Sequence, residues 1–202
     1  MKWIISCVLC IAIQNVDAQK VQAGLMLGIN TTFQNFSSTK LSFETESKLG
    51  YNLIAFGRVN VANVLIQPEI GYYNNRASFV FDPSGSNIDA TIGIGQFYSS
   101  MMLGYKLGTI RVLLGPMFYR ELSQSENKTV IENLSIESVN NGQNKWGAQV
   151  GLGLNIGRHW QVDARFQKML NSFNFKAIVD SESEVMNGTQ SNLSFFLGYS
   201  LF

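Results

Sequence analysis

The chain has 202 residues, enough for one domain with a complete core, and its formal net charge is +1 at pH 7. This balance gives no reason to expect nucleic acid or another strongly charged partner. Charged residues make up only 14% of the chain, below the roughly 25% that is usual for soluble domains, whereas 12% of the residues are aromatic and 18 are glycine.

Residues 1–18 have the features of a secretory signal peptide. A positive start at Lys2 is followed by an apolar segment, and the peptide ends in Ala18, a small residue of the kind that signal peptidase recognises. We expect cleavage after Ala18, which leaves residues 19–202 as the exported domain. No other run approaches the roughly 20 apolar residues of a membrane-spanning helix.

Both cysteines, Cys7 and Cys10, lie in this predicted peptide, so the exported domain contains no cysteine. Their spacing is therefore not read as a redox or metal-binding pair. A lipid anchor on Cys10 is the alternative, but Val8 and Leu9 precede that cysteine where a lipoprotein has small residues.

Beyond residue 19 the chain alternates apolar and polar side chains with a period of two, which predicts β-strands. Eight stretches follow this pattern, although the two faces of the fourth become distinct only from Phe97 onwards. The stretches are residues 21–36, 48–58, 64–73, a segment ending near 106, then 110–119, 146–156, 160–170 and 193–201.

The clearest alternation predicts a β-hairpin at residues 146–170. Its apolar face includes Trp146 and Val162, and its other face carries glycine, glutamine, asparagine and charges. In an in-register pairing Arg165 faces Gly151 and Asp163 faces Gly153. Charged side chains beside glycines suit the crowded polar lumen of a small barrel, where two large neighbours would not fit.

A second hairpin is predicted at Leu107-Gly108, which as a two-residue turn would place Arg111 opposite Gly104. Two prolines, Pro68 and Pro116, lie in the middle of predicted strands. Because proline cannot donate to the strand ladder, we expect a bulge or an omitted hydrogen bond at each.

The connections alternate in length. Those near residues 60, 107 and 158 are short, and those near 40, 82, 132 and 181 are long and polar. An even strand count, with short turns and both termini at one end, is typical of bacterial outer-membrane barrels. The sequence therefore predicts an all-β fold, an eight-stranded antiparallel up-and-down transmembrane β-barrel. We expect a monomer in the outer membrane, with lipid against its apolar face.

A soluble lipocalin-like barrel is the alternative, since it has the same period with the two faces exchanged. Glycines on the polar face and aromatic residues near strand ends favour the membrane. The aromatic residues expected at the two membrane interfaces are Tyr105 and Trp160 at the short-turn end and Tyr72, Tyr119 and Trp146 at the long-loop end.

Five charged residues fall on the predicted lumen face: Arg58, Glu69, Arg111, Asp163 and Arg165. An isolated buried ion costs far more than a paired one, so we expect a network that links both acids to some of the arginines. The main interpretation is a structural plug, and a gated ion path or proton relay is the alternative. Eight strands leave an interior just wide enough for side chains, so free diffusion of solutes is not expected.

The sequence offers little for catalysis, and we expect no enzymatic activity, cofactor or metal. The one histidine, His159, lies in a predicted short turn, away from the long loops. No Gly-x-Ser-x-Gly elbow occurs, and the Gly-x-Gly pairs lack the third glycine of a nucleotide loop. The acidic run at residues 180–184 lacks the ligand spacing of a calcium site and is interpreted as a solvated loop.

Three motifs occur in order along the chain. Residues 65–72 read LIQPEIGY with a Pro-Glu pair, residues 113–117 read LLGPM, and residues 147–166 form the glycine-rich hairpin. In these motifs the chain resembles the small outer-membrane barrel proteins of Bacteroidota called PorT-like, over nearly the whole exported domain. It departs from them at Ser100-Met101-Met102, where a proline is common. The resemblance implies an outer-membrane barrel without an assigned reaction.

Three functional hypotheses follow. The first is a non-enzymatic barrel that anchors, adheres or scaffolds through its long extracellular loops. The second is an accessory subunit of a protein-secretion or envelope-assembly machine, with envelope proteins as partners. The third is a lipid-modifying or proteolytic barrel, which needs a catalytic residue at the long-loop end, opposite to the predicted place of His159.

Overall fold

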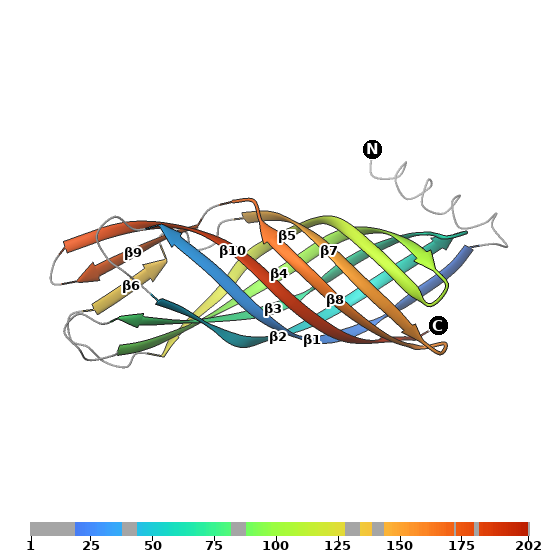
Figure 1. Ribbon diagram of the computed structural model, residues 1–202, viewed down its shortest axis with the longest axis horizontal. Coiled ribbons are helices and arrows are strands. Elements are labelled where there is room, and N and C mark those ends of the chain that lie inside the picture. The colour runs from blue at the N-terminus through green and yellow to red at the C-terminus, as the bar shows by residue number, and fades with distance from the viewer. Residues whose placement is uncertain are drawn as a thin grey trace.

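The computed structural model describes residues 19–37, 44–81, 88–127, 134–138, 144–171, 173–179 and 182–201. The predicted signal peptide, residues 1–18, lies outside this part of the chain. Within the described residues, no helix is long and apolar enough to cross a bilayer. Nearly all of the described chain is β-strand, and the strands wrap around one long axis (Figure 1).

The strands fall into one continuous antiparallel sheet. In chain order they are β1 (Gln19–Ser37), β2 (Glu44–Val61), β3 (Val64–Phe81), β4 (Ile88–Leu107), β5 (Ile110–Asn127), β6 (Leu134–Ser138), β7 (Asn144–Ile156), β8 (Trp160–Met169), β9 (Phe173–Val179) and β10 (Glu182–Ser200).

Eight of these strands close a barrel. Their order is β1-β2-β3-β4-β5-β7-β8-β10, and β10 pairs back to β1, from Gly24 opposite Ser200 to Ser37 opposite Asn187. Closure gives every strand a partner on both sides, as backbone groups within a bilayer require. The predicted eight-stranded antiparallel barrel is confirmed.

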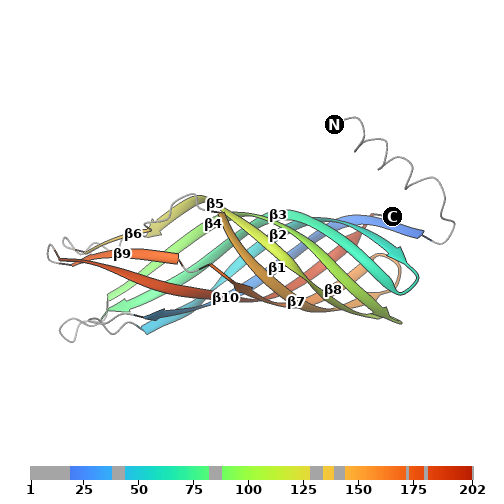
Figure 2. The ribbon, with the colours of Figure 1, turned by 90° about the horizontal axis from the view of Figure 1, so that it is seen from above.

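The two remaining strands extend the wall at one end. β9 pairs with the first residues of β10, and β6 pairs with β9. Figure 2 shows both at the end of the barrel remote from the C-terminus and the short turns. They therefore lie at the end of the long connections.

Several strands run further than the alternation predicted. β3 and β4 stay paired up to Phe81 opposite Ile88, so much of the long connection expected near residue 82 is strand. β10 likewise begins at Glu182, within the long connection expected near residue 181. The two-residue period fails there because a strand outside the lipid has water or polar groups on both faces and no apolar face to conserve.

Three tight turns join strands at the other end. Ala62, Gly108 and Gly157 have positive φ angles of 53°, 65° and 66°, which match the right-handed twist of a hairpin. The hairpin of β7 and β8 has the predicted register, with Gly151 opposite Arg165 and Gly153 opposite Asp163.

The predicted register of the hairpin between β4 and β5 is wrong by two residues. The turn residues are Gly108 and Thr109, with Leu107 paired to Ile110, so Arg111 lies opposite Lys106 and not Gly104. The first turn position requires a positive φ, which glycine adopts freely and leucine does not. Arg111 still lies beside a glycine, because its partner on β7 is Gly153.

Each mid-strand proline interrupts one ladder without a bulge. Between β2 and β3, pairing stops at Phe56–Glu69 and resumes in the same register at Val59–Ile66, which leaves out Pro68. Between β4 and β5, the pairs on either side of Pro116 likewise keep one register. The omitted-bond form of the prediction is thus confirmed, since a missing donor removes pairs without adding a residue.

The barrel is apolar outside and filled inside. On β7 the side chains of Trp146, Val150 and Leu152 are exposed by 54%, 51% and 60%, whereas Lys145 and Gln149 between and beside them are buried. A lipocalin-like barrel would bury the apolar face instead. Trp146 and Val162 point outward, so the barrel has its apolar face outside, as a membrane barrel does.

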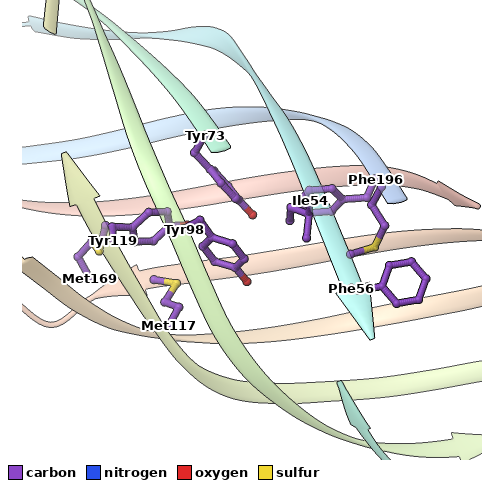
Figure 3. Packing of buried hydrophobic residues seen from close by; sticks show 9 residues of the cluster. Ile54, Phe56, Tyr73, Tyr98, Met117, Tyr119, Met169 and Phe196 are labelled. Atoms are coloured by element: carbon purple, nitrogen blue, oxygen red, sulfur yellow. The ribbon is translucent and has the colours of Figure 1, made fainter. Parts of the chain in front are cut away.

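Buried apolar side chains form a large cluster in the lumen (Figure 3) and a second, smaller one of Leu65, Met102 and Leu113. The large cluster is held by aromatic and methionine side chains that share the inward parity of their strands. Its members are Met26, Ile54, Phe56, Tyr73, Tyr98, Met117, Tyr119, Met169 and Phe196.

Candidate functional site

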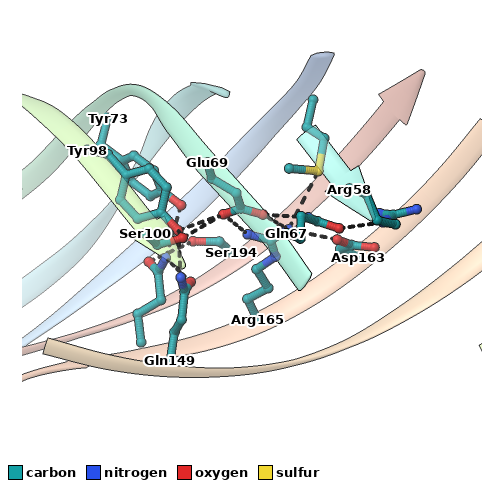
Figure 4. A network of polar contacts seen from close by, with 12 residues as sticks. Arg58, Gln67, Glu69, Tyr73, Tyr98, Ser100, Gln149, Asp163, Arg165 and Ser194 are labelled. Carbon is teal, nitrogen blue, oxygen red and sulfur yellow. Dashed lines mark hydrogen bonds and ion pairs between the residues drawn. The ribbon is translucent and has the colours of Figure 1, made fainter. Parts of the chain in front are cut away.

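The centre of the lumen is organised around the carboxylate of Glu69, which shares the inward parity of β3 with Gln67 and Tyr73. Five donor atoms reach it. Gln67 Nε2 donates at 2.6 Å, the Tyr98 hydroxyl at 2.8 Å and the Ser100 hydroxyl at 3.0 Å. Arg165 supplies the other two, as Figure 4 shows. These donors occupy both oxygens of the carboxylate, two of them at Oε1 and three at Oε2.

Arg165 is fully buried and contacts both acids of the lumen. Its Nη1 lies 2.8 Å from Glu69 Oε2, its Nη2 lies 2.9 Å from Glu69 Oε1, and the same Nη2 lies 2.8 Å from Asp163 Oδ2. The guanidinium also lies over the ring of Phe196, 4.8 Å from its centroid. This planar, bidentate geometry is the one that arginine forms with carboxylates and lysine cannot reproduce.

Asp163 extends the network towards the short-turn end. Its Oδ1 lies 2.5 Å from Arg111 Nη2. Arg111 Nη1 and Arg58 Nη2 then donate to the same atom, Gln161 Oε1, each at 2.7 Å. Arg58 Nε also donates to Gln67 Oε1 at 2.6 Å, which joins the chain of contacts back to Glu69.

The structure thus places all five charged residues of the predicted set in one connected network, with both acids held by arginines. Three arginines against two acids leave the network with a net charge of +1. Sequence reasoning missed the neutral members that connect the ions: Gln67, Tyr98, Ser100, Gln149 and Gln161. The alternation predicts that these side chains point inward, but the sequence around a glutamine does not indicate which charged side chain it contacts.

Two lumen glycines make room for these ions. A Cβ added at Gly153 would lie 2.6 Å from both Arg111 Nη2 and Asp163 Oδ1, and one at Gly151 would lie 2.9 Å from Arg165 Cγ. Real Cβ atoms essentially never approach that closely. The pairing of charge with glycine in the sequence is therefore a packing requirement.

On the long-connection side of the ions, three tyrosines fill the lumen. The ring centroids of Tyr73 and Tyr98 are 4.8 Å apart, those of Tyr73 and Tyr119 are 5.3 Å apart, and those of Tyr98 and Tyr119 are 5.2 Å apart. Gln149 donates to the Tyr98 hydroxyl at 2.6 Å and Gln167 donates to that of Tyr73 at 3.0 Å. The three rings and the two glutamine amides together form a packed layer across the barrel.

One predicted interface aromatic is misplaced. Tyr119 was expected at the membrane interface, but its exposed fraction is 0% and it belongs to the lumen layer. The physical reason is parity, because Tyr119 shares the inward face of β5 with Arg111 and Met117.

The other four interface aromatics face outward or partly outward. Trp146 contacts Phe118 with ring centroids 5.0 Å apart, and Trp160 contacts Tyr199 at 5.1 Å. Tyr105 is 47% exposed at the short-turn end. Tyr72 is half-buried, and its ring centroid lies 6.2 Å from that of Tyr51. Their role as membrane anchors stays a prediction.

No catalytic arrangement forms among the described residues. His159 lies in the short turn, where its Nδ1 is 3.0 Å from the Ser200 carbonyl oxygen and its ring stacks on Tyr199. Within the same part of the chain, no group of three or more histidine, cysteine or acidic side chains could hold a metal ion. The contacts of the network join side chains from β2, β3, β4, β5, β7 and β8.

The family comparison agrees with this barrel fold. The family profile described as outer membrane protein beta-barrel domain matches residues 4–200. The chain belongs to this family. Comparison with curated proteins finds no match.

Solved structures of bacterial outer-membrane proteins share the fold. Outer membrane protein OprG of Pseudomonas aeruginosa aligns with a TM-score of 0.54 at 11% identity, over 93% of this chain and 99% of OprG. Outer membrane protein AlkL, determined in lipid bilayers, aligns with a TM-score of 0.55 at 14% identity, over 89% of this chain and 90% of AlkL. At these identities the likeness is one of fold. The protein is an outer-membrane β-barrel.

Proposed function

We propose that this protein is a non-enzymatic barrel of the bacterial outer membrane that serves as an envelope anchor, adhesin or scaffold through its extracellular end. The observation that carries the proposal is the filled lumen. An eight-stranded barrel has an interior just wide enough for side chains. Here that interior holds the ion network and, next to it, the layer of three tyrosines.

The strand lengths support a role outside the lipid. The outward face of β7 is apolar from Trp146 to Ile156, a span of about 25 Å for a strand tilted by about 40°, which matches the apolar band of such barrels. The strands β1 to β5 have 18 to 20 residues each, whereas roughly 10 suffice to cross. The excess lies at the long-connection end, which bacterial barrels expose to the exterior.

The proposal includes export by the predicted signal peptide, with cleavage after Ala18. It also places the chain in the PorT-like group of Bacteroidota barrels, on the motifs at residues 65–72, 113–117 and 147–166.

A tip-trimmed variant tests this role. Replacing residues 78–91 by Asn-Gly joins Ala77 to Ile92, which are partners in the β3–β4 ladder, so the barrel wall below is kept. The control is a variant in which the same residues are reordered without changing composition. Heat-modifiable migration on a gel reports whether each barrel forms.

Attachment of intact cells to surfaces and cross-linking to neighbouring envelope proteins are then compared. The proposal expects the trimmed barrel to assemble normally and to lose attachment or the cross-linked partner. Unchanged attachment and cross-linking in the tip-trimmed variant would contradict it. A partner that stays bound through gentle extraction would favour the accessory-subunit hypothesis over adhesion.

A further inference from the structure

A polar cavity of about 280 Å³ opens at the short-turn end of the barrel, below the ion network. Its wall comes from the ends of several strands that are distant in sequence. Buried side chains at its inner end are Arg58, Arg111 and Gln161, and its rim carries Lys106, Arg158 and His159. By the topology of bacterial barrels this mouth faces the periplasm.

The charged side chains that line this cavity are basic. The described residues that line it include three arginines and a lysine, and among them there is no aspartate or glutamate. The nearest acid along the network, Asp163, is already held by Arg111 and Arg165. Among the described residues, neither Lys106 nor Arg158 forms an ion pair. The cavity therefore has an uncompensated positive field at close range, inside low-dielectric walls that focus it.

The inner end of the cavity has the geometry of an anion site. Two guanidinium groups converge on one neutral oxygen, Gln161 Oε1, at 2.7 Å each. Arginine forks of this kind bind carboxylate and phosphate oxygens more strongly than amide oxygens. Within the described part of the chain, Arg111 Nε and Gln161 Nε2 are buried donors without a hydrogen-bond partner. These two donors, which lie beside the arginines, could each donate a hydrogen bond to a bound acceptor.

We propose that this cavity binds a phosphate-bearing anion at the periplasmic mouth of the barrel. Its volume leaves room for a phosphate group with its first waters. The buried arginines meet the phosphate oxygens, and Lys106 and Arg158 attract the anion from the rim. The phosphate belongs either to a free phosphomonoester of the periplasm or to the headgroup of an inner-leaflet lipid.

The first test is titration of the refolded full-length protein with inorganic phosphate, in nanodiscs of phosphatidylcholine, followed by calorimetry. We expect saturable binding that weakens as sodium chloride is raised. The variant K106Q/R158Q removes two rim charges and is expected to bind about tenfold more weakly, at roughly 0.7 kcal/mol for each exposed charge. The control Arg120→Gln removes an exposed charge near the other end and should leave the affinity unchanged.

The variant Gln161→Glu gives a sharper test. It places a carboxylate of nearly the same shape where the two arginines meet, so the barrel should keep or gain thermal stability and phosphate binding should be lost. Heat-modifiable migration confirms folding of each variant. Absence of saturable phosphate binding by the wild type, or equal affinity in Gln161→Glu, would overturn the proposal.

The source of the phosphate is tested by changing the lipid. In nanodiscs that contain phosphatidylglycerol, a site filled by lipid headgroups shows a weaker apparent affinity for inorganic phosphate. A site for free phosphomonoesters keeps its affinity and binds glycerol 3-phosphate as well. Both results support the anion site and differ only in its natural occupant.

Discussion

Glu69 and Arg165 join opposite walls of the barrel. Glu69 is on β3 and Arg165 is on β8, four strands apart in either direction around the closed order of eight. Their side chains meet through two hydrogen bonds of 2.8 and 2.9 Å in a fully buried ion pair. A cross-brace of this kind fixes the cross-section of the barrel and blocks its axis at the same point.

Removing one partner of the brace should destabilise the barrel strongly. Glu69→Gln leaves Asp163 as the one carboxylate that contacts the buried guanidinium of Arg165 within the described residues, and we expect a loss of about 3 kcal/mol in the free energy of unfolding. Urea titration in phospholipid vesicles measures it. Ser100→Ala removes one of the five donors and should cost only about 1 kcal/mol. The double variant E69Q/R165M should recover part of the loss, and an additive loss would refute the pairing.

A side chain at Gly153 should destabilise the barrel. Gly153→Ala adds a Cβ that must displace the contact between Arg111 and Asp163, and we expect a loss of about 1–3 kcal/mol in the free energy of unfolding. Gly57→Ala is the matched control, because there the added Cβ would meet only Pro68 Cγ at 3.8 Å. Equal stability of the two variants in the same urea titration would show that the lumen is looser than described.

A charge on the outward face should be costly in the middle of β7 and cheap at its end. Leu152→Arg is expected to lower the free energy of unfolding in vesicles by about 2–4 kcal/mol, because the side chain meets acyl chains near the midplane. Asn144→Arg, at the exposed start of β7, should cost no more than about 1 kcal/mol. A neutral or stabilising Leu152→Arg would mean that this face meets water.

The orientation of the barrel can be read with single cysteines, because both native cysteines lie within residues 1–18. Arg158→Cys places a thiol in the turn between β7 and β8, and Asp180→Cys places one between β9 and β10. A membrane-impermeant maleimide should label position 180 on intact cells and position 158 only after the outer membrane is permeabilised. The reverse pattern would invert the topology and move the basic cavity to the cell surface.

The parity of side chains is what the sequence predicted best. A two-residue period over residues 146–170 was enough to place Asp163 and Arg165 in the lumen beside glycines, because a strand has only two faces. The same parity argument, applied consistently, would have placed Tyr119 inside.

Features that depend on a single backbone angle or on contacts across the lumen were not predicted. The register between β4 and β5 depends on which turn residue takes a positive φ, and a shift of one turn position moved Arg111 by two residues. The meeting of Arg58 and Arg111 at Gln161 depends on strands that are not neighbours in the sheet. Strand periodicity carries no information about such distances.

Single-channel recording in planar bilayers tests the sealed lumen most directly. Wild-type protein, inserted at known amounts and checked for heat-modifiable migration, should give no discrete conductance steps, because the brace between Glu69 and Arg165 and the layer of tyrosines block the axis. A variant that removes both the brace and a tyrosine, E69A/R165A/Y98A, should conduct if it inserts. Stable open steps from the wild-type barrel at low voltage would contradict the account.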